Sequence, residues 1–240
     1  MQIRNAAAIN TNLGLSALPY DFVSIPITTF INPDINDQLS WAGCSYATNT
    51  VQARRYDNAL YDDFWWVADF SRQPLADALV VDPATMAAAE FNDVSQYSDA
   101  YVAREFEGIP FAADTFDDNS YLEMRTLQKI ELDYMFTQDT RALAFSRIMS
   151  KPMSEMQIKV DSLIAKTPES ALKYMIYSAH DDNIANIMKW LHPLDVEMDY
   201  VLFASQVVFE LKYDSACLQT TNNDSCFRVG IRWNGNELKL

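Results

Sequence analysis

The chain has 240 residues, of which 49% are hydrophobic and 12% aromatic, enough to bury the core of one or two domains. Its 18 lysines and arginines against 33 aspartates and glutamates give a net charge of -15. A surface with this charge repels a phosphate backbone, which argues against nucleic acid or an anionic membrane as a partner. No stretch approaches the roughly 18 consecutive apolar residues of a membrane span, so we expect a soluble globular protein.

Glycine and metal-binding residue types are scarce. The chain has 5 glycines, and no three of them have the spacing of a G-x-G-x-x-G turn or a Walker loop. This excludes the nucleotide-binding folds that depend on such loops. The 2 histidines and 3 cysteines lack the paired spacing of a zinc site, so we expect neither a structural metal nor a cofactor.

The N-terminal segment is predicted to be a helix followed by a strand. The helix covers residues 2–17 with Arg4 in its first turn, and the strand covers residues 22–30, which are rich in Val, Ile and Thr. The segment has no basic start followed by a long apolar core, so it is not predicted to be a signal peptide.

The middle of the chain, residues 32–168, is predicted to be mostly helical. It contains aromatic clusters, alanine-rich turns and, after Pro152, apolar residues at helical spacing. We interpret its methionines and aromatic residues as core packing.

The last third is predicted to be mixed α/β. An apolar run over residues 172–178 indicates a strand, and apolar residues at helical spacing from Ile184 to Leu191 indicate a helix after a polar turn. Residues 201–213 and 227–233 are predicted to pair as a hairpin. Asn234-Gly235 then predicts a tight turn into a further strand that the chain does not finish.

The polar turn between the strand and the helix has the sequence His180-Asp181-Asp182-Asn183. In α/β sheets, ligands bind beyond the carboxyl ends of strands, where helix N-termini present unpaired N–H groups to anions. An imidazole and carboxylates at this position can contact an anion and protonate a leaving group, as phosphoryl or acyl transfer requires. Alternatively, Asp182 or Asn183 caps the helix and the other residues are ordinary turn residues.

Three other patterns are weaker. Cys226 and Arg232 have the C-x5-R spacing of cysteine phosphatases, but the residues between them alternate as in a strand, on which a thiolate loop cannot form. A metal site within residues 180–182 is disfavoured because adjacent carboxylates on one turn diverge. His192 precedes proline and is interpreted as a helix end rather than a ligand.

The turn and its surroundings resemble a known family, the histidine acid phosphatases, which form the second branch of the histidine phosphatase superfamily. Tyr177-Ser178-Ala179-His180-Asp181 after an apolar strand is similar to the C-terminal motif of that family. Other weaker matches follow in the family's order: Arg4-Asn5 opening a helix to Leu13-Gly14-Leu15, Ser24-Ile25-Pro26-Ile27, Ala204-Ser205 with Phe209-Glu210-Leu211, and Trp233-Asn234-Gly235 with Leu238.

The resemblance implies a fold and a reaction. The fold is an α/β three-layer sandwich, a phosphoglycerate mutase-like core formed by residues 1–31 and 168–240, with a mostly helical cap over residues 32–167. The reaction is hydrolysis of a small-molecule phosphate monoester through a phosphohistidine, without metal. By resemblance, Asp181 is the general acid, His180 donates a hydrogen bond to the phosphate, and Arg4 clamps the phosphate.

The sequence departs from the family in one respect. Members carry an R-H-G-x-R-x-P segment upstream of the helix that Arg4 begins, and its histidine is the nucleophile; this sequence contains no such segment. Neither His180 nor His192 replaces it. We interpret the sequence as an N-terminally truncated piece that lacks the first core strand, with Met1 an internal methionine. We expect this chain alone to be inactive, and unstable or aggregation-prone because sheet edges stay unpaired.

The cysteines indicate the compartment. Cys217 and Cys226 flank a polar loop that holds an N-glycosylation sequence, Asn223-Asp224-Ser225, which suits an oxidising, secretory compartment. Cys217 and Cys226 are expected to form a disulfide and to leave Cys44 unpaired. The full-length protein is thus expected to be secreted, lysosomal or vacuolar. The alternative to an acid phosphatase is a catalytically inactive pseudophosphatase that binds anions or a partner on the same fold.

Overall fold

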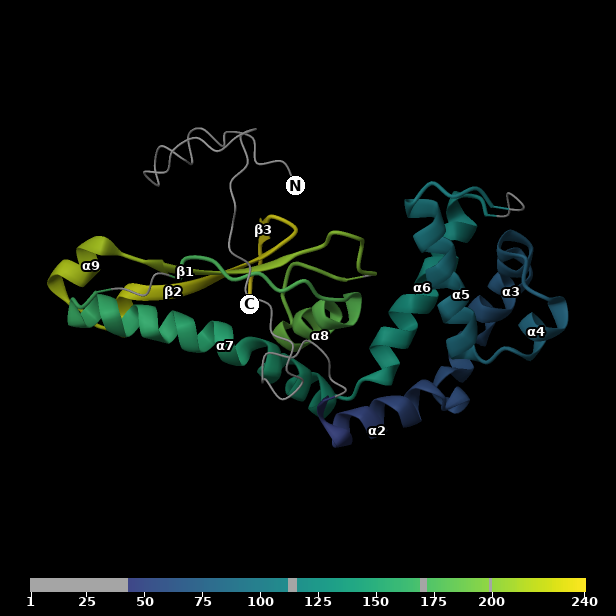
Figure 1. Cartoon of the computed structure of the whole chain (residues 1–240), viewed down its shortest axis with the longest axis horizontal. Helices are drawn as coiled ribbons and strands as arrows, with labels where there is room; N and C mark the ends of the chain where they lie inside the picture. Colours follow the sequence, from purple (N-terminus) through teal and green to yellow (C-terminus); the bar gives the residue numbers. More distant parts are fainter. Residues whose placement is uncertain (1–42, 112–115, 169–171, 199) are drawn as a thin grey trace, which may run out of the picture. The chain divides into compact units, whose positions relative to one another are not determined.

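A computed structural model of the chain describes residues 43–111, 116–168, 172–198 and 200–240 (Figure 1). By its internal contacts the chain divides into two units, Met1–Ile35 and Asn36–Leu240, and all described residues belong to the second. The helix predicted over residues 2–17 with Arg4, and the strand predicted over residues 22–30, lie outside the described residues.

The described residues form a mixed α/β structure that is mostly helical, with one small antiparallel sheet. This confirms the coarse fold class, and the helical prediction for the middle of the chain is also confirmed. The helical elements are α2 (Ser45–Arg55), η3 (Asn58–Phe64), α3 (Trp65–Leu79), α4 (Pro83–Ala88), α5 (Phe91–Phe106), α6 (Asp118–Met135), α7 (Gln138–Ala165), α8 (Asp181–Leu191), α9 (Ser215–Thr220) and η4 (Asp224–Cys226).

Several of these helices begin at side chains that accept a hydrogen bond from the first turn. Asp82, before a proline at the first position of α4, accepts from the Thr85 N–H at 2.9 Å, and Asp117 accepts from the Ser120 N–H at 2.8 Å. Thr137 caps α7 in the same way. Local sequence therefore sets where these helices start.

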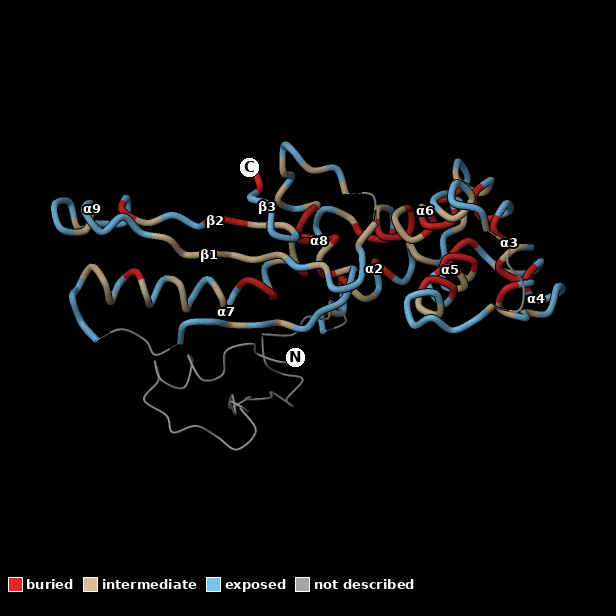
Figure 2. The backbone as a smooth tube through the Cα atoms, turned by 90° about the horizontal axis from the view of Figure 1, so that it is seen from above, coloured by how far each residue is buried: buried red, intermediate tan, exposed pale blue. Residues whose placement is uncertain are grey.

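The largest core lies between η3, α3, α5 and α6, where Figure 2 shows buried backbone along the helices. Phe91 and Tyr61 are fully buried, and their rings stack with centroids 4.5 Å apart. Trp65 meets the Phe91 ring edge-on at 5.8 Å. This aromatic cluster holds the N-terminal ends of α3 and α5 against η3.

The sheet consists of β1 (Val207–Tyr213), β2 (Phe227–Trp233) and β3 (Asn236–Glu237), paired antiparallel in the order β1-β2-β3. The predicted hairpin is confirmed. So is the turn at Asn234-Gly235, where both residues have the positive φ that a tight hairpin turn requires, 47° and 89°. Apolar residues of β1 and β2 pack on α7 and α8, which cover one face of the hairpin (Figure 1).

Two strand predictions are wrong as made. Residues 172–178 form no strand: Tyr174 and Ile176 are 71% and 74% exposed, and none of the three described strands pairs with this segment. An apolar run becomes a strand only where a ladder partner lies beside it. The strand predicted over residues 201–213 begins only at Val207, because Ala204 has a φ of 60° that interrupts extended backbone. The three-layer core stays a prediction.

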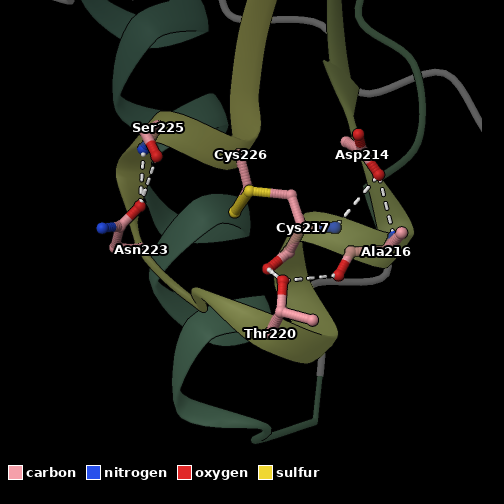
Figure 3. Close-up of a disulfide and its surroundings, with 7 residues drawn as sticks. All are labelled: Asp214, Ala216, Cys217, Thr220, Asn223, Ser225 and Cys226. Carbon is pink, nitrogen blue, oxygen red and sulfur yellow. Dashed lines mark hydrogen bonds between the residues drawn. A yellow bond between two sulfur atoms is a disulfide. The ribbon is translucent and has the colours of Figure 1, made fainter.

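The predicted disulfide is confirmed: Cys217 and Cys226 are joined, with their Cα atoms 5.4 Å apart, and Cys44 is a free thiol. The bridge closes the connection between β1 and β2, which contains α9 and η4 (Figure 3). None of the described helices combines the length and apolar character needed to cross a membrane.

Replacing both Cys217 and Cys226 with serine is expected to lower the free energy of unfolding by about 2–3 kcal/mol, the loop-closure value for residues 9 apart in sequence. Denaturant unfolding of the oxidised chain measures this. Cys44→Ser is the matched control and is expected to change the free energy by less than about 0.5 kcal/mol. Equal stability of the double variant and the control would show that the bridge does not constrain the unfolded chain.

Candidate functional site

The predicted turn lies at the N-terminus of α8. His180 is the N-cap, with extended backbone, and its N–H donates to Asn183 Oδ1 at 3.0 Å. Asn183 accepts this hydrogen bond with a buried side chain, so the capping interpretation holds for this residue. The side chains of His180 and Asp181 are exposed. Capping by Asn183 therefore leaves His180 and Asp181 facing solvent, where they can meet a ligand.

His180 and Asp181 line the same pocket, which has a volume of about 250 Å³. Its other walls come from α2, α5 and α6. The polar residues that α2, α5 and α6 contribute to it include Arg55, Ser95, Asp99, Gln128 and Glu131. The structure thus brings together two of the three predicted site residues, while Arg4 lies outside the described residues.

An ion pair ties three of the pocket's walls together. Arg55 Nη2 lies 2.6 Å from Glu131 Oε1, and its Nε donates to the same oxygen at 2.7 Å. Ser95 Oγ donates to the other carboxylate oxygen of Glu131 at 2.6 Å. Glu131 is nearly buried, so its charge is balanced by Arg55 and both its oxygens are used. This carboxylate shapes the pocket.

Asp99 is the pocket's second acidic group of interest. Its Oδ1 accepts from Gln128 Nε2 at 2.8 Å. Partial loss of water contact raises the pKa of Asp99 above its ordinary value, and the negative charge of Asp181 raises it further. Asp99 and Asp181 therefore interact electrostatically across the pocket, and Asp99 takes up a proton at a higher pH than an isolated aspartate would.

Removing the charge of Asp181 is expected to lower the pKa of Asp99 toward its ordinary value. Carboxyl carbon NMR titration of Asp99 in the Asp181→Asn variant measures this. Asp224→Asn, which removes the same charge in η4, is the control and is expected to leave the Asp99 titration unchanged. An Asp99 titration that is identical in all three proteins would contradict the proximity of the two carboxyl groups.

The same shift has a consequence for stability. Because the folded state binds the Asp99 proton more tightly than the unfolded state, the contribution of Asp99 to stability falls as pH rises from its unfolded pKa through its raised folded pKa. Asp99→Asn is accordingly expected to raise the free energy of unfolding at neutral pH. Unfolding measured across acid pH is expected to show this gain disappearing below pH of about 4.

A buried arginine fixes α8 relative to the pocket's other walls. Arg141 of α7 donates through Nη2 to the carbonyl oxygens of Leu132 and Asp133 at 2.8 and 2.9 Å, and through Nη1 to Asn186 Oδ1 at 3.1 Å. The first two acceptors end α6 and the third lies on α8. Burial lowers the pKa of Arg141. Its hydrogen bonds hold the middle of α8 beside the last turn of α6.

The structure decides two of the weaker patterns, those at Cys226 and at His192. Cys226 is in the disulfide and leads directly into β2, where Arg232 pairs with Glu210 at 3.1 Å, so the C-x5-R interpretation is excluded. His192 ends α8 with a φ of 48°, which confirms the interpretation as a helix end. Over the described ranges, no group of three or more His, Cys, Asp or Glu residues is arranged to hold a metal ion.

Comparisons with protein-family models, with curated proteins and with solved structures find no match to this chain. The assignment of a function consequently rests on the pocket itself. Local sequence identified His180 and Asp181 because a polar turn before an amphipathic helix is visible in the chain. It missed Arg55, Asp99 and Glu131, which lie singly on separate helices and meet only through helix packing.

Proposed function

We propose that this pocket binds the phosphate group of a small phosphomonoester, and that Asp181 protonates the departing oxygen in an acid phosphatase reaction of the histidine phosphatase type. The observation that carries the proposal is that His180 and Asp181, exposed at the N-terminus of a capped helix, line one pocket together. A three-layer histidine phosphatase core around this pocket is part of the proposal.

The N-terminus of α8 supports anion binding. The first backbone N–H groups of a helix and its dipole favour negative charge at this end, and the imidazole ring of His180 adds a hydrogen-bond donor. Asp181, one residue later, lines the same pocket, and its Oδ1 accepts from the Asp182 N–H at 2.8 Å. A carboxylic acid in this place lowers the barrier by giving its proton to the leaving alkoxide as the bond to phosphorus breaks.

The pocket's charge supports work at acid pH. Four carboxylates line it, those of Asp99, Glu131, Asp181 and Asp182, and Arg55 pairs with the one on Glu131. At neutral pH the negative charges of Asp99 and Asp181 repel a phosphate dianion. Protonation of Asp99, whose pKa is raised, removes one of these charges, and Asp181 must itself carry a proton to act as an acid.

The nucleophile is inferred only from the family resemblance. The histidine of an R-H-G-x-R-x-P segment would attack phosphorus, and this sequence contains no such segment. His192 lies at the other end of α8 from His180 and lines a different pocket. We propose that the described site supplies the acid and part of the phosphate-binding surface.

Phosphate binding is testable on the chain as it stands, because it has only 2 histidines. In a chain labelled on histidine carbons, inorganic phosphate added at acid pH is expected to shift the ring signals of His180 and to leave those of His192 unchanged. His180→Ala is expected to weaken phosphate binding about 10-fold, as loss of one charged hydrogen bond does. His192→Asn serves as the control, since asparagine tolerates positive φ.

Two outcomes would overturn the proposal. If phosphate shifts the ring signals of neither histidine, the pocket is not an anion site. If phosphate shifts the ring signals of both histidines equally, the change reflects ionic strength and not binding. Phosphate binding without any hydrolysis by the longest protein that the gene's transcripts encode would instead favour a pseudophosphatase over an enzyme.

A further inference from the structure

The connection between β1 and β2 carries a compact loop at the end of the hairpin. Asp214 begins it by accepting from the N–H groups of Ala216 and Cys217 at 2.8 and 3.1 Å, which starts α9, and the disulfide closes it (Figure 3). The loop contains Asn223-Asp224-Ser225, the only Asn-x-Ser or Asn-x-Thr sequence in the 240 residues. The sequence shows only that this tripeptide is present, whereas the structure shows its exposure and its hydrogen bonds.

The side chains of Asn223 and Ser225 are exposed and joined by hydrogen bonds. Asn223 Oδ1 accepts from Ser225 Oγ at 2.6 Å and from the Ser225 N–H at 3.0 Å. Figure 3 shows the amide nitrogen of Asn223 on the side turned away from Ser225. The amide oxygen is thus fully engaged within the tripeptide, whereas Nδ2 faces outward and donates to none of the described residues.

The loop is anchored so that Asn223 stays on the surface. Asn222 Nδ2 donates to the carbonyl oxygen of Ile164 at the end of α7, at 3.1 Å, and the Cys226 N–H donates to the carbonyl oxygen of Asn223 at 3.1 Å. Cys226 itself is buried beside the exposed tripeptide. A large group attached to Asn223 Nδ2 would extend into solvent and displace none of these contacts.

The disulfide is an independent observation on the same loop. A bridge between Cys217 and Cys226 forms and persists where thiols are oxidised, as in the lumen of the secretory pathway. Transfer of oligosaccharide to asparagine takes place in that lumen. The same loop therefore holds an accessible asparagine and a disulfide that indicates the compartment in which asparagine is glycosylated.

We propose that Asn223 is a site of N-linked glycosylation. Its Nδ2 attacks the anomeric carbon of an oligosaccharide carried on a lipid pyrophosphate. A nitrogen–carbon bond forms, the bond from that carbon to the pyrophosphate oxygen breaks, the lipid pyrophosphate leaves, and the transferase takes the proton lost from Nδ2. No oxidant or reductant is needed.

The site is independent of the phosphate pocket. The loop joins the ends of β1 and β2 at Tyr213 and Phe227, whereas Val207, at the opposite end of β1, packs with Ile187 of α8. A glycan at Asn223 therefore stands apart from His180. Its presence or absence is expected to leave phosphate binding unchanged, and failure of one proposal does not affect the other.

The test translates the full chain, preceded by a cleavable secretion signal, with microsomes from the endoplasmic reticulum. Chain protected from added protease has entered the lumen. This protected chain is expected to carry one glycan, seen as a single mass step that peptide N-glycosidase removes. Digestion in heavy-oxygen water is expected to leave labelled aspartate at position 223.

Matched variants locate the modification. Asn223→Gln and Ser225→Ala are each expected to abolish the mass step. Asn119→Gln, the same chemical change at an exposed asparagine of α6, and Ser225→Thr, which keeps the hydroxyl, are expected to retain it. Protected wild-type chain without the mass step overturns the proposal, and so does a mass step that persists in Asn223→Gln.

Discussion

Replacing Phe91 with alanine is expected to lower the free energy of unfolding by about 3–5 kcal/mol. Phe91 is fully buried, stacks on Tyr61 at 4.5 Å and receives the edge of Trp65 at 5.8 Å. The substitution removes the ring's buried apolar area and leaves a cavity lined by two aromatic rings. Because these rings come from η3 and α3, and Phe91 opens α5, the cavity cannot close without moving a helix.

Denaturant unfolding of the wild-type chain and the variant measures this loss. Phe70→Ala is the matched control, because Phe70 lies on α3 with 41% of its surface exposed. It is expected to cost less than about 1 kcal/mol. Equal costs for the two substitutions would mean that the aromatic cluster does not form the core of the helical region.

Asp181→Asn is expected to reduce hydrolysis of an alkyl phosphate at acid pH by roughly 10²- to 10⁴-fold, the range of general acid catalysis. This expectation depends on the proposed function and applies to the longest protein that the gene's transcripts encode. An amide keeps the shape of the side chain, but its N–H protons are too weakly acidic to be transferred to the leaving group. The loss is therefore expected in kcat, while phosphate binding changes little.

The leaving group distinguishes an acid from a positioning residue. The phenolate of an aryl phosphate whose phenol is strongly acidic leaves without needing a proton. Asp181→Asn is therefore expected to slow hydrolysis of such a substrate far less than hydrolysis of an alkyl phosphate. Asp195→Asn, in the turn beyond α8, keeps the acceptor for the Lys239 N–H and is expected to leave both rates unchanged. Equal losses for both substrates in Asp181→Asn would contradict proton donation by Asp181.

The features that sequence predicted correctly are those with local causes. Helix α8 depends on the apolar spacing from Ile184 to Leu191, and the hairpin turn depends on the positive φ of Asn234 and Gly235. The extended segment that forms β2 likewise depends on a few neighbouring residues. The cysteine pair lies only 9 residues apart. Short-range geometry decides each of these, so the sequence was sufficient.

The features that sequence missed depend on distant partners. Arg55 meets Glu131 across 76 residues, and Asp99 meets Gln128 across 29, through the packing of α2, α5 and α6. Nothing beside Asp99 in the sequence marks it as part of a pocket. The strand predicted over residues 172–178 failed for the same reason, since an extended segment is a strand only if another strand lies beside it.

Helix α7 contains Pro152, which has no N–H to donate to the carbonyl oxygen of Ile148. The first half of α7 contacts α8 through Ile148 and Met149, and its far end accepts from Asn222 at Ile164. The missing backbone bond lies between these two attachments. The two ends of this 28-residue helix can therefore differ slightly in direction as each packs on its own partner. A small bend at this point breaks no backbone hydrogen bond, because the bond to Ile148 is already absent.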